Sequence, residues 1–467
     1  MTQFATFVFA LGICGLFWLD RDRNARTSIA LWLPAIWLMI AGSRPVSTWL
    51  QMAPPKLPES YVEGSPFDRA VYTGLLLVGL VVLFRRQKGV LRFLRVNWPL
   101  ALFVFYCAVS IAWSDFPEVA VKRWIKSIGD YVMILIVLTD ADPFAALKRV
   151  LARAGFVLLP LSVLVIKYYP DIGRAYAAHW EGTAYFVGVA ADKNMLGMAC
   201  LVFGLSSWWR FLREFQCERA ERKKGSLIAH GALVAMTVWL FWMANSMTSL
   251  ACFVMASALL VVTSSPRIVR RRMLVHVFVA FVLTFCFCVL FLNVGSFLLT
   301  AVGRNPTLTG RTDLWATLIA LAPNPLLGAG FESFWLGPRL EKLWSIYWWQ
   351  PNESHNGYLE VYLNLGWLGV AFFAGAVLAG YRNAIGLLKT DPDSGRLRLA
   401  YLVVGLAYNL TEAAIRTADL MWLAFLLALI AVPKATVPQE SLQSVALTTD
   451  NQAKSLDAVA EEIPAWR

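Results

Sequence analysis

The sequence predicts an all-α, polytopic integral membrane protein with about 12–14 transmembrane helices and one large polar loop. Of the 467 residues, 58% are hydrophobic and 15% are charged, which is too apolar for a soluble protein of this size. Most apolar runs have about 16–25 residues, the length that a helix needs to cross a bilayer. The runs do not alternate polar and apolar residues, as the strands of a membrane barrel would.

The predicted spans follow one another along nearly the whole chain. The first, "MTQFATFVFALGICGLFWLD", lacks the basic segment that opens a signal peptide, so we expect it to remain as a membrane helix. The apolar runs cover residues 4–19, 28–42, 68–84, 97–113, 122–139, 150–167, 191–209, 226–245, 247–263, 274–299, 357–380, 398–411 and 420–432.

Loop charge predicts the orientation of these spans. One set of loops, including "DRDRNAR", "RRQKGVLRFLR" and "RFLREFQCERAERKK", holds with the tail about twice the lysine and arginine of the other set. Because basic loops stay in the cytoplasm, we expect this set to be cytoplasmic. The opposite set contains residues 43–67, 114–121, 168–190 and 300–356.

Four parts of the chain follow from this pattern. Residues 1–299 are expected to form transmembrane helices with short loops, and residues 357–432 the C-terminal transmembrane helices. Residues 300–356 form the longest polar insertion, on the outer side. Residues 433–467 show little hydrophobic periodicity, so we expect a disordered cytoplasmic tail.

Several classes of protein are disfavoured. The formal net charge of +12 fits basic loops that meet anionic lipid better than a nucleic-acid partner. The chain has no P-loop or glycine-rich nucleotide motif, so ATP is not expected as an energy source. The seven cysteines have no paired zinc spacing and no disulfide framework.

The polar insertion ends at His355, directly before an apolar helix. Within it, Arg311 is followed by a short amphipathic stretch, and "PNPLLGAGFESF" then breaks the helix with proline and glycine. We expect a re-entrant or surface helix that brings Arg311 and His355 together. A lone interfacial histidine is more often structural, and this alternative stays open.

These segments resemble the O-antigen ligase and polymerase superfamily, most closely its exopolysaccharide polymerases. The resemblance rests on "GRTDLW", "PNPLLGAGFESF" and "SHNGYLEVYLNLGWLG". Supporting matches in the same order are "SIAWSDFPEVAVKR", "VAADKNMLGM", "NSMTSL" and "NLTEAAI".

The resemblance implies a glycosyltransferase of the bacterial inner membrane, with residues 300–356 as its periplasmic catalytic loop. The donor would be a glycan on undecaprenyl pyrophosphate, and the acceptor a growing polysaccharide. No cofactor and no metal are implied. Expected partners are inner-membrane lipids and the proteins that set chain length and export the product. His355 and Arg311 match the functional histidine and arginine of the family.

The chemistry of the two residue types agrees with these roles. A lipid pyrophosphate leaving group gains negative charge, which a planar guanidinium such as that of Arg311 can bind bidentately. The attacking hydroxyl must lose a proton, and His355 suits a general base. Glu353 could orient His355, serve as the base itself, or be a solvated or capping carboxylate.

A second cationic region is expected to help hold the two donor phosphates. Arg174, Lys193 and Arg123 are its candidates, and Lys126 could line the same cavity. Lys193 could equally be an interfacial lysine whose ammonium reaches the headgroups.

Two further groups of side chains have open roles. Glu412 and Arg416 are auxiliary candidates, or an ion pair that locks two helices. The candidate sugar-binding residues are Trp344, Tyr347, Trp348, Trp349 and Asn356. The four aromatic residues among them could instead form an aromatic belt at the membrane interface.

Three functions remain to be distinguished. The leading interpretation is a polymerase of exopolysaccharide repeat units. A ligase that transfers the finished glycan to a lipid A-core would use the same donor chemistry. A transporter or flippase for polysaccharide or lipid-linked sugar is disfavoured, because the polar motifs gather on one face and no internal repeat is visible.

Overall fold

The computed structural model describes residues 1–22, 25–53, 57–176, 184–291 and 311–433. It confirms an all-α architecture, with one short antiparallel strand pair among the described residues. Residues 300–310 of the predicted loop, and all of the predicted tail except Pro433, lie outside the described ranges. Residues Met1–Ala431 form one compact unit.

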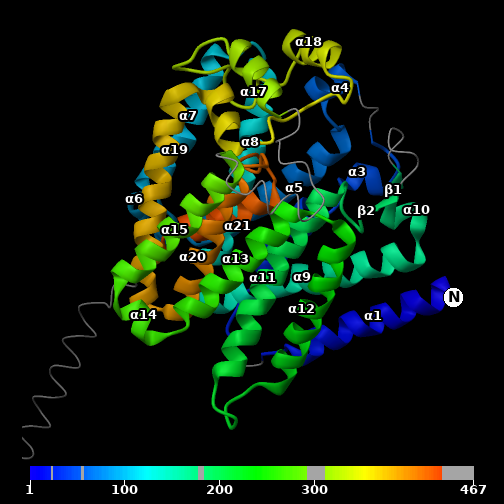
Figure 1. Ribbon diagram of the computed structural model, residues 1–467, viewed down its shortest axis with the longest axis vertical. Helices are drawn as coiled ribbons and strands as arrows, with labels where there is room; N and C mark the ends of the chain where they lie inside the picture. Colours follow the sequence, from blue (N-terminus) through cyan, green and yellow to red (C-terminus); the bar gives the residue numbers. More distant parts are fainter. Residues whose placement is uncertain (23–24, 54–56, 177–183, 292–310, 434–467) are drawn as a thin grey trace, which may run out of the picture. The chain divides into compact units, whose positions relative to one another are not determined.

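The elements of this unit are helices, with two short strands between α10 and α11 (Figure 1). Their bounds are α1 (Thr2–Leu19), η1 (Ile29–Leu31), α2 (Trp32–Ala41), α3 (Val46–Trp49), α4 (Pro58–Glu63), α5 (Pro66–Arg85), α6 (Gln87–Val96), α7 (Trp98–Val109), η2 (Ser110–Trp113), α8 (Pro117–Leu138), α9 (Pro143–Tyr168), α10 (Pro170–Gly173), β1 (Arg174–Tyr176), β2 (Ala184–Phe186), α11 (Lys193–Gln216), α12 (Lys224–Ala244), α13 (Met247–Thr263), α14 (Pro266–Arg270), α15 (Arg272–Phe291), α17 (Arg311–Ala320), α18 (Pro338–Ile346), α19 (Gly357–Thr390), α20 (Pro392–Tyr408) and α21 (Leu420–Leu429).

Helix starts follow from capping side chains. Ser65 precedes α5, Asp142 precedes α9 and Asp192 precedes α11, and each side chain accepts a backbone N–H of the first turn. Proline occupies the first position of α5 and α9, where no backbone donor is lost. The polar residues that bound the apolar runs therefore define where the helices begin.

Six helices in the described part of the chain are long and apolar enough to cross a membrane, or up to seven if the bent pair α6–α7 is one span. Four shorter apolar helices accompany them. Among the expected 12–14 spans, others lie in these shorter helices, in the charged helix α8, or partly outside the described residues. The polytopic helical fold itself is confirmed.

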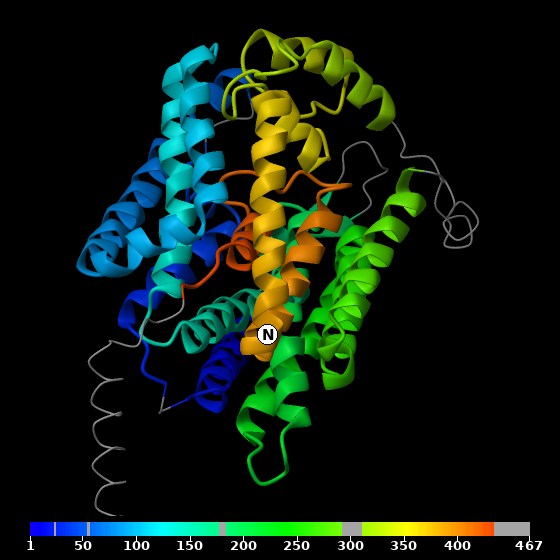
Figure 2. The ribbon, with the colours of Figure 1, turned by 90° about the vertical axis from the view of Figure 1, so that its left-hand side faces the viewer.

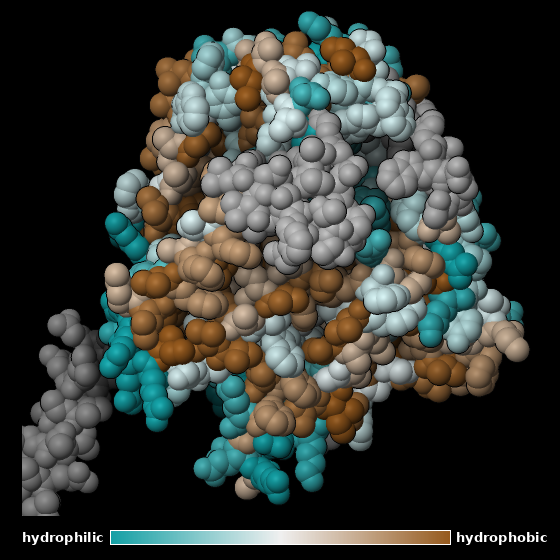
Figure 3. All heavy atoms as spheres, in the orientation of Figure 1, coloured by the Kyte–Doolittle hydropathy of each residue, from teal (hydrophilic) through white to brown (hydrophobic). Residues whose placement is uncertain are grey.

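Burial separates the helices into an inner and an outer group. About 78% of the spanning window is buried in α9 and in α11, against 11% in α1 and 17% in α5. The outer helices expose large apolar side chains such as Phe7 and Phe84. Below the grey residues in Figure 3, a band of mostly brown apolar residues crosses the face, and teal residues gather beneath it, around the α11–α12 loop. Lipid is the environment that such an apolar surface suits.

Parts of the two predicted sets of loops lie at opposite ends of this unit: the α11–α12 loop and α14 of the basic set at one end, and α4, α17 and α18 of the other set at the opposite end (Figure 1). In one set, Arg44 donates to Ile172 O at 2.5 Å, and Arg339 pairs with Asp115 at 2.7 Å. In the basic set, Arg210 pairs with Asp20 at 2.7 Å. Each set is thus held together by its own polar contacts.

A layer of short helices covers the upper end of α19 (Figure 2). Its apolar core joins α17, α18 and the start of α19, and consists of Leu314, Leu318, Ala329, Phe334, Trp335, Leu340, Leu343 and Leu363. The predicted short surface helices of the polar loop are therefore present as α17 and α18.

A break inside α19 anchors this layer. Gly366 adopts φ 62°, and a Cβ there would lie 2.2 Å from the Leu326 carbonyl. Trp367 N donates to Pro325 O and Leu368 N to Leu326 O, at 2.9 and 3.2 Å. The "PNPLLGAG" segment thus accepts bonds from backbone amides at the break.

Candidate active site

His355 sits directly before the N-cap of α19. Asn356 is that cap, because its side-chain oxygen accepts from Tyr358 N and Leu359 N at 3.0 Å. His355 has φ 52°, a left-handed conformation that is uncommon outside glycine and costs of order 1–3 kcal/mol. Ser354 N donates to Glu360 at 2.6 Å and Trp315 Nε1 donates to Ser354 O at 2.7 Å, which fixes the preceding backbone.

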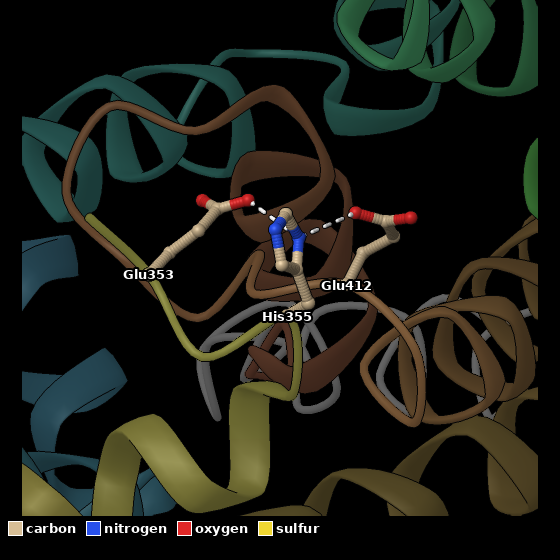
Figure 4. A group of neighbouring side chains, drawn as sticks. All are labelled: Glu353, His355 and Glu412. Atoms are coloured by element: carbon tan, nitrogen blue, oxygen red, sulfur yellow. Dashed lines mark ion pairs between the residues drawn. The ribbon is translucent and has the colours of Figure 1, made fainter. Parts of the chain in front are cut away.

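Two carboxylates flank the imidazole of His355 (Figure 4). Nδ1 lies 3.0 Å from Glu353 Oε1 and 3.5 Å from Glu412 Oε2. Neither contact has the alignment of a hydrogen bond, so both are ion pairs. The His355 side chain is 24% exposed, which leaves it accessible from the loop surface.

An arginine lies on the far side of each carboxylate. Arg416 NH1 lies 2.6 Å from Glu353 Oε2. Arg311 NH2 lies 3.6 Å from Glu412 Oε1, and Arg311 NH1 donates to Thr411 O at 2.5 Å. We call Arg416, Glu353, His355, Glu412 and Arg311 the His355 ion-pair chain. The predicted ion pair between Glu412 and Arg416 does not form. Arg416 pairs with Glu353 instead, and Glu412 pairs with Arg311 and His355.

The electrostatics of the His355 ion-pair chain favour a charged imidazole. Burial alone would lower the pKa of His355, but Glu353 and Glu412 outweigh it and raise the pKa to about 9. Burial would raise the pKa of Glu353, but Arg416 and His355 lower it to about 2. Near neutral pH the resting site therefore holds an imidazolium between two carboxylates. To act as a general base, His355 must first lose this proton. The sequence did not reveal that His355 is charged in the resting site.

The segment 409–419, which joins α20 to α21, brings Glu412 and Arg416 to His355. Gly357 N donates to Asn409 O and Glu412 O at 2.9 and 3.1 Å. A Cβ at Gly357 would lie 2.0 Å from Asn409 Oδ1, so the close approach depends on glycine. The start of α19 and segment 409–419 thus form one unit around the imidazole.

Two acidic residues that were not among the predicted site residues hold this segment from below. Glu332 accepts from Thr417 N at 3.0 Å and from Thr417 Oγ1 at 2.6 Å. Asp130 accepts from Ala418 N at 2.9 Å and from Trp37 Nε1 at 2.8 Å. A lone carboxylate inside the apolar run 122–139 was the signal for Asp130.

The predicted donor-binding cations do not all gather at His355. Arg123 donates to Glu332 O at 2.5 Å and contacts no residue of the ion-pair chain through this bond. Arg174 donates to Ile166 O from Nε at 3.3 Å and from NH2 at 3.2 Å. Lys193 is exposed at the first turn of α11. Arg311 is the predicted cation that the structure places in the His355 ion-pair chain.

Of the predicted sugar-binding aromatics, Trp348 and Trp349 are exposed, whereas Trp344 and Tyr347 are half-buried against the apolar core of the short-helix layer. The Trp349 ring stacks on the His355 ring, with centroids 6.2 Å apart. Trp348 is 68% exposed. Tyr347 packs beside Trp349, and Trp344 donates to Pro351 O at 2.9 Å. Trp349 and Trp348 are therefore the aromatic faces most accessible to a sugar near His355.

The space below the His355 ion-pair chain is small. A cavity of about 50 Å³ reaches Arg416, Thr417 and Glu332. This volume holds a few waters and not a sugar. Among the described residues, this cavity therefore offers no room for a larger ligand, and the exposed loop side is the accessible side of His355.

Glu353, His355 and Glu412 could also hold a metal ion, because one ligand atom from each lies within 4.8 Å of the others. A cation there would have to replace the proton on Nδ1 and share both carboxylates with the arginines, because Arg416 and Arg311 contact the oxygen of each carboxylate that does not face His355. The arginines supply the positive charge that a metal would bring, so the donor set fits a metal poorly as it stands.

The sequence of this chain is similar to those of known proteins. Residues 231–374, which include Arg311, Glu353 and His355, match the family model described as O-antigen ligase. The chain is 25% identical over 332 residues to the exopolysaccharide production protein ExoQ of Rhizobium meliloti strain 1021. That match covers 69% of this chain and 73% of the relative. The predicted resemblance to the O-antigen ligase and polymerase superfamily is confirmed by both matches.

Proposed function

We propose that this protein is a metal-independent glycosyltransferase that polymerises exopolysaccharide repeat units on the periplasmic face of the inner membrane. The donor is a glycan on undecaprenyl pyrophosphate, and the acceptor is a second lipid-linked glycan. The observation that carries the proposal is the His355 ion-pair chain, which joins Arg311 and His355 across 44 residues of sequence. Proteins that set chain length and export the product would act beside it.

The reaction requires one bond to form and one to break. An acceptor hydroxyl oxygen attacks the anomeric carbon of the donor glycan. The bond between that carbon and the phosphate oxygen breaks, and the lipid pyrophosphate leaves with the electron pair. The hydroxyl proton passes to a base on the protein.

His355 in its neutral form is the proposed base. The carboxylates of Glu353 and Glu412 hold Nδ1, which leaves Nε2 as the nitrogen that accepts the acceptor proton. The same carboxylates then stabilise the imidazolium. Their effect on the pKa makes His355 a stronger base than an ordinary histidine, although a scarcer one at neutral pH.

Arg311 and Arg416 are the proposed ligands of the leaving pyrophosphate. Their side chains are 26% and 50% exposed, so each guanidinium can turn toward a phosphate at the surface. Lys193 and Arg174 would extend this binding along the donor. Trp348 and Trp349 would stack on sugar rings beside the base.

A ligase activity is the second candidate, because the matching family model carries that description. The relative named for exopolysaccharide production favours the polymerase. Both reactions use the same donor chemistry, so the acceptor distinguishes them.

The test uses purified full-length protein with a lipid-pyrophosphate oligosaccharide and no nucleotide. Longer chains should form, and EDTA should leave most of the activity. Products that appear only with a lipid A-core acceptor would assign a ligase. Loss of activity with EDTA and its recovery with magnesium would contradict metal independence.

A further inference from the structure

A second cationic cavity lies between the first halves of α5 and α8. Its volume is about 270 Å³, and no residue of the His355 ion-pair chain lines it. Three of its cations, Lys122, Arg123 and Lys126, fall on one face of α8, and Arg69 faces them from α5. None of the reaction steps at His355 uses this cavity.

The charge of the cavity is not fully balanced by the protein. Its wall holds four cations against two carboxylates, Glu63 and Asp68, and Asp68 also accepts from Ser47 N and Oγ at 2.9 and 2.5 Å. Lys126 Nζ lies 4.2 Å from the centre of the Tyr72 ring, and Lys122 is exposed. Among the described residues, no carboxylate lies within ion-pair distance of either lysine. Such a cavity suits a ligand with a compact negative charge.

The position of the cavity points to a lipid. α5 is one of the least buried spanning helices, and its lower half exposes Leu77, Val81 and Phe84. A long apolar chain could therefore lie along α5 while its charged head enters the cavity from the side. The cavity lies on the same side as the catalytic loop, because Arg123 donates to Glu332 O in that loop.

The cavity is nevertheless separated from the bond that breaks. Arg123 donates to Glu332 O, and the Glu332 carboxylate accepts from Thr417. Thr417 follows Arg416, which joins the His355 ion-pair chain through Glu353. The leaving pyrophosphate must lie at the anomeric carbon, beside His355. Because no residue of the His355 ion-pair chain lines the cavity, a group bound in the cavity is a different one from the leaving pyrophosphate.

We propose that the α5–α8 cavity binds the diphosphate of the acceptor lipid, the one that is retained in the product. This inference rests on the proposed function, because joining two lipid-linked glycans requires two lipid diphosphates. One leaves at His355, and the other stays at a distance set by the glycan between them. A ligase acceptor would carry no such prenyl diphosphate.

Binding of farnesyl diphosphate to the purified full-length protein tests the cavity directly. We expect two sites, of which Lys122→Gln with Lys126→Gln removes one and Arg311→Ala with Arg416→Ala removes the other. Farnesol and inorganic pyrophosphate separate the contributions of the tail and the charge. A lysine variant that retains both sites would overturn the proposal even if elongation is never observed.

Acceptor kinetics test its role. Wild-type protein should use the repeat unit on its lipid diphosphate at least about tenfold more efficiently than the same oligosaccharide freed from lipid. The lysine variant should lose this preference through a higher KM for the lipid-linked acceptor, with the KM for donor unchanged. Lys126→Arg should keep the preference, and Lys342→Gln, an exposed charge on α18, is the matched control. No preference in wild type, or a raised KM for donor, would contradict the proposal.

Discussion

At the scale of single residues, the site consists of alternating charges, and His355 is its centre. The imidazole lies within 3.5 Å of both carboxylates, and each carboxylate faces an arginine. Each charge is therefore partly neutralised by a neighbour in the resting protein. A pyrophosphate that draws the arginines away would leave the carboxylates to act on His355 alone, which strengthens it as a base.

The pH dependence of activity tests His355 as the base. Because its pKa is raised to about 9, roughly 1% of it is neutral at pH 7. The value of kcat/KM should rise about tenfold per pH unit and level off near pH 9. In Glu353→Gln the rise should shift toward the ordinary value of 6.5. A profile that is flat between pH 6 and pH 9 would instead assign the imidazolium to charge stabilisation.

The same pKa values predict that the stability of the folded protein falls over the alkaline pH range in which activity rises. His355 has a raised pKa, so its contribution is complete below pH 6.5 and is lost as pH rises through about 9. Glu353 has a depressed pKa, so its contribution is complete above pH 4.5 and is lost as pH falls through about 2. Thermal unfolding in detergent should show the largest stabilisation between pH 4.5 and 6.5. His355→Ala should lack the loss on the alkaline side.

Replacement of Arg311 tests its role at the phosphate. Arg311→Lys keeps the charge but loses the planar fork that grips two oxygens. We expect kcat/KM for donor to fall at least about tenfold, which corresponds to roughly 1.4 kcal/mol in the barrier. Arg382→Lys at the far end of α19 is the control. Activity within twofold of wild type would show that bidentate contact is not needed.

At the scale of elements, α19 and segment 409–419 decide where the side chains meet. α19 begins against segment 409–419 at Gly357 and breaks against "PNPLLGAG" at Gly366. The two contacts fix the start of α19 to the short-helix layer on one side and to the α20–α21 connection on the other. His355 lies between them, so the precision of the site depends on both.

Gly366→Ala tests the break. Alanine at φ 62° is strained, and its Cβ would lie 2.2 Å from the Leu326 backbone. We expect a loss of more than about 1 kcal/mol in the free energy of unfolding, together with reduced activity. Gly375→Ala in the same helix meets no atom within 4 Å and should be neutral or slightly stabilising. Equal effects of the two variants would argue against the anchoring role of the break.

At the scale of the whole compact unit, the loops gather at two ends, and the site belongs to the end with less basic charge. The basic α11–α12 loop and the layer of α17 and α18 lie at opposite ends in Figure 1. If the basic end is cytoplasmic, the His355 ion-pair chain faces the periplasm. Substrates carried by lipid would then reach it from the outer leaflet.

Cysteine labelling tests this orientation. Ser345→Cys on α18 is exposed and should react with an impermeant thiol reagent in cells with only the outer membrane permeabilised. The native Cys217, in the basic loop after α11, is the internal control and should react only after the inner membrane is broken. The reverse pattern would overturn the periplasmic site and the mechanism with it.

The sequence by itself determined the class of fold, the short helices of the polar loop, and Arg311 and His355 as candidates. These features depend on local patterns: apolar run length, proline and glycine positions, and short motifs. Run length alone left the number of spans open between 12 and 14, because it does not reveal where a helix ends or bends against its neighbours.

Only the tertiary structure decided which charges meet. The partners of Glu412 are His355 and Arg311, and the partner of Arg416 is Glu353, all at least 57 residues away in sequence. It also decided that His355 is protonated at rest, since that depends on two carboxylates brought together in space. Pairings of this kind follow from the packing of α19 against segment 409–419, and no local pattern contains that information.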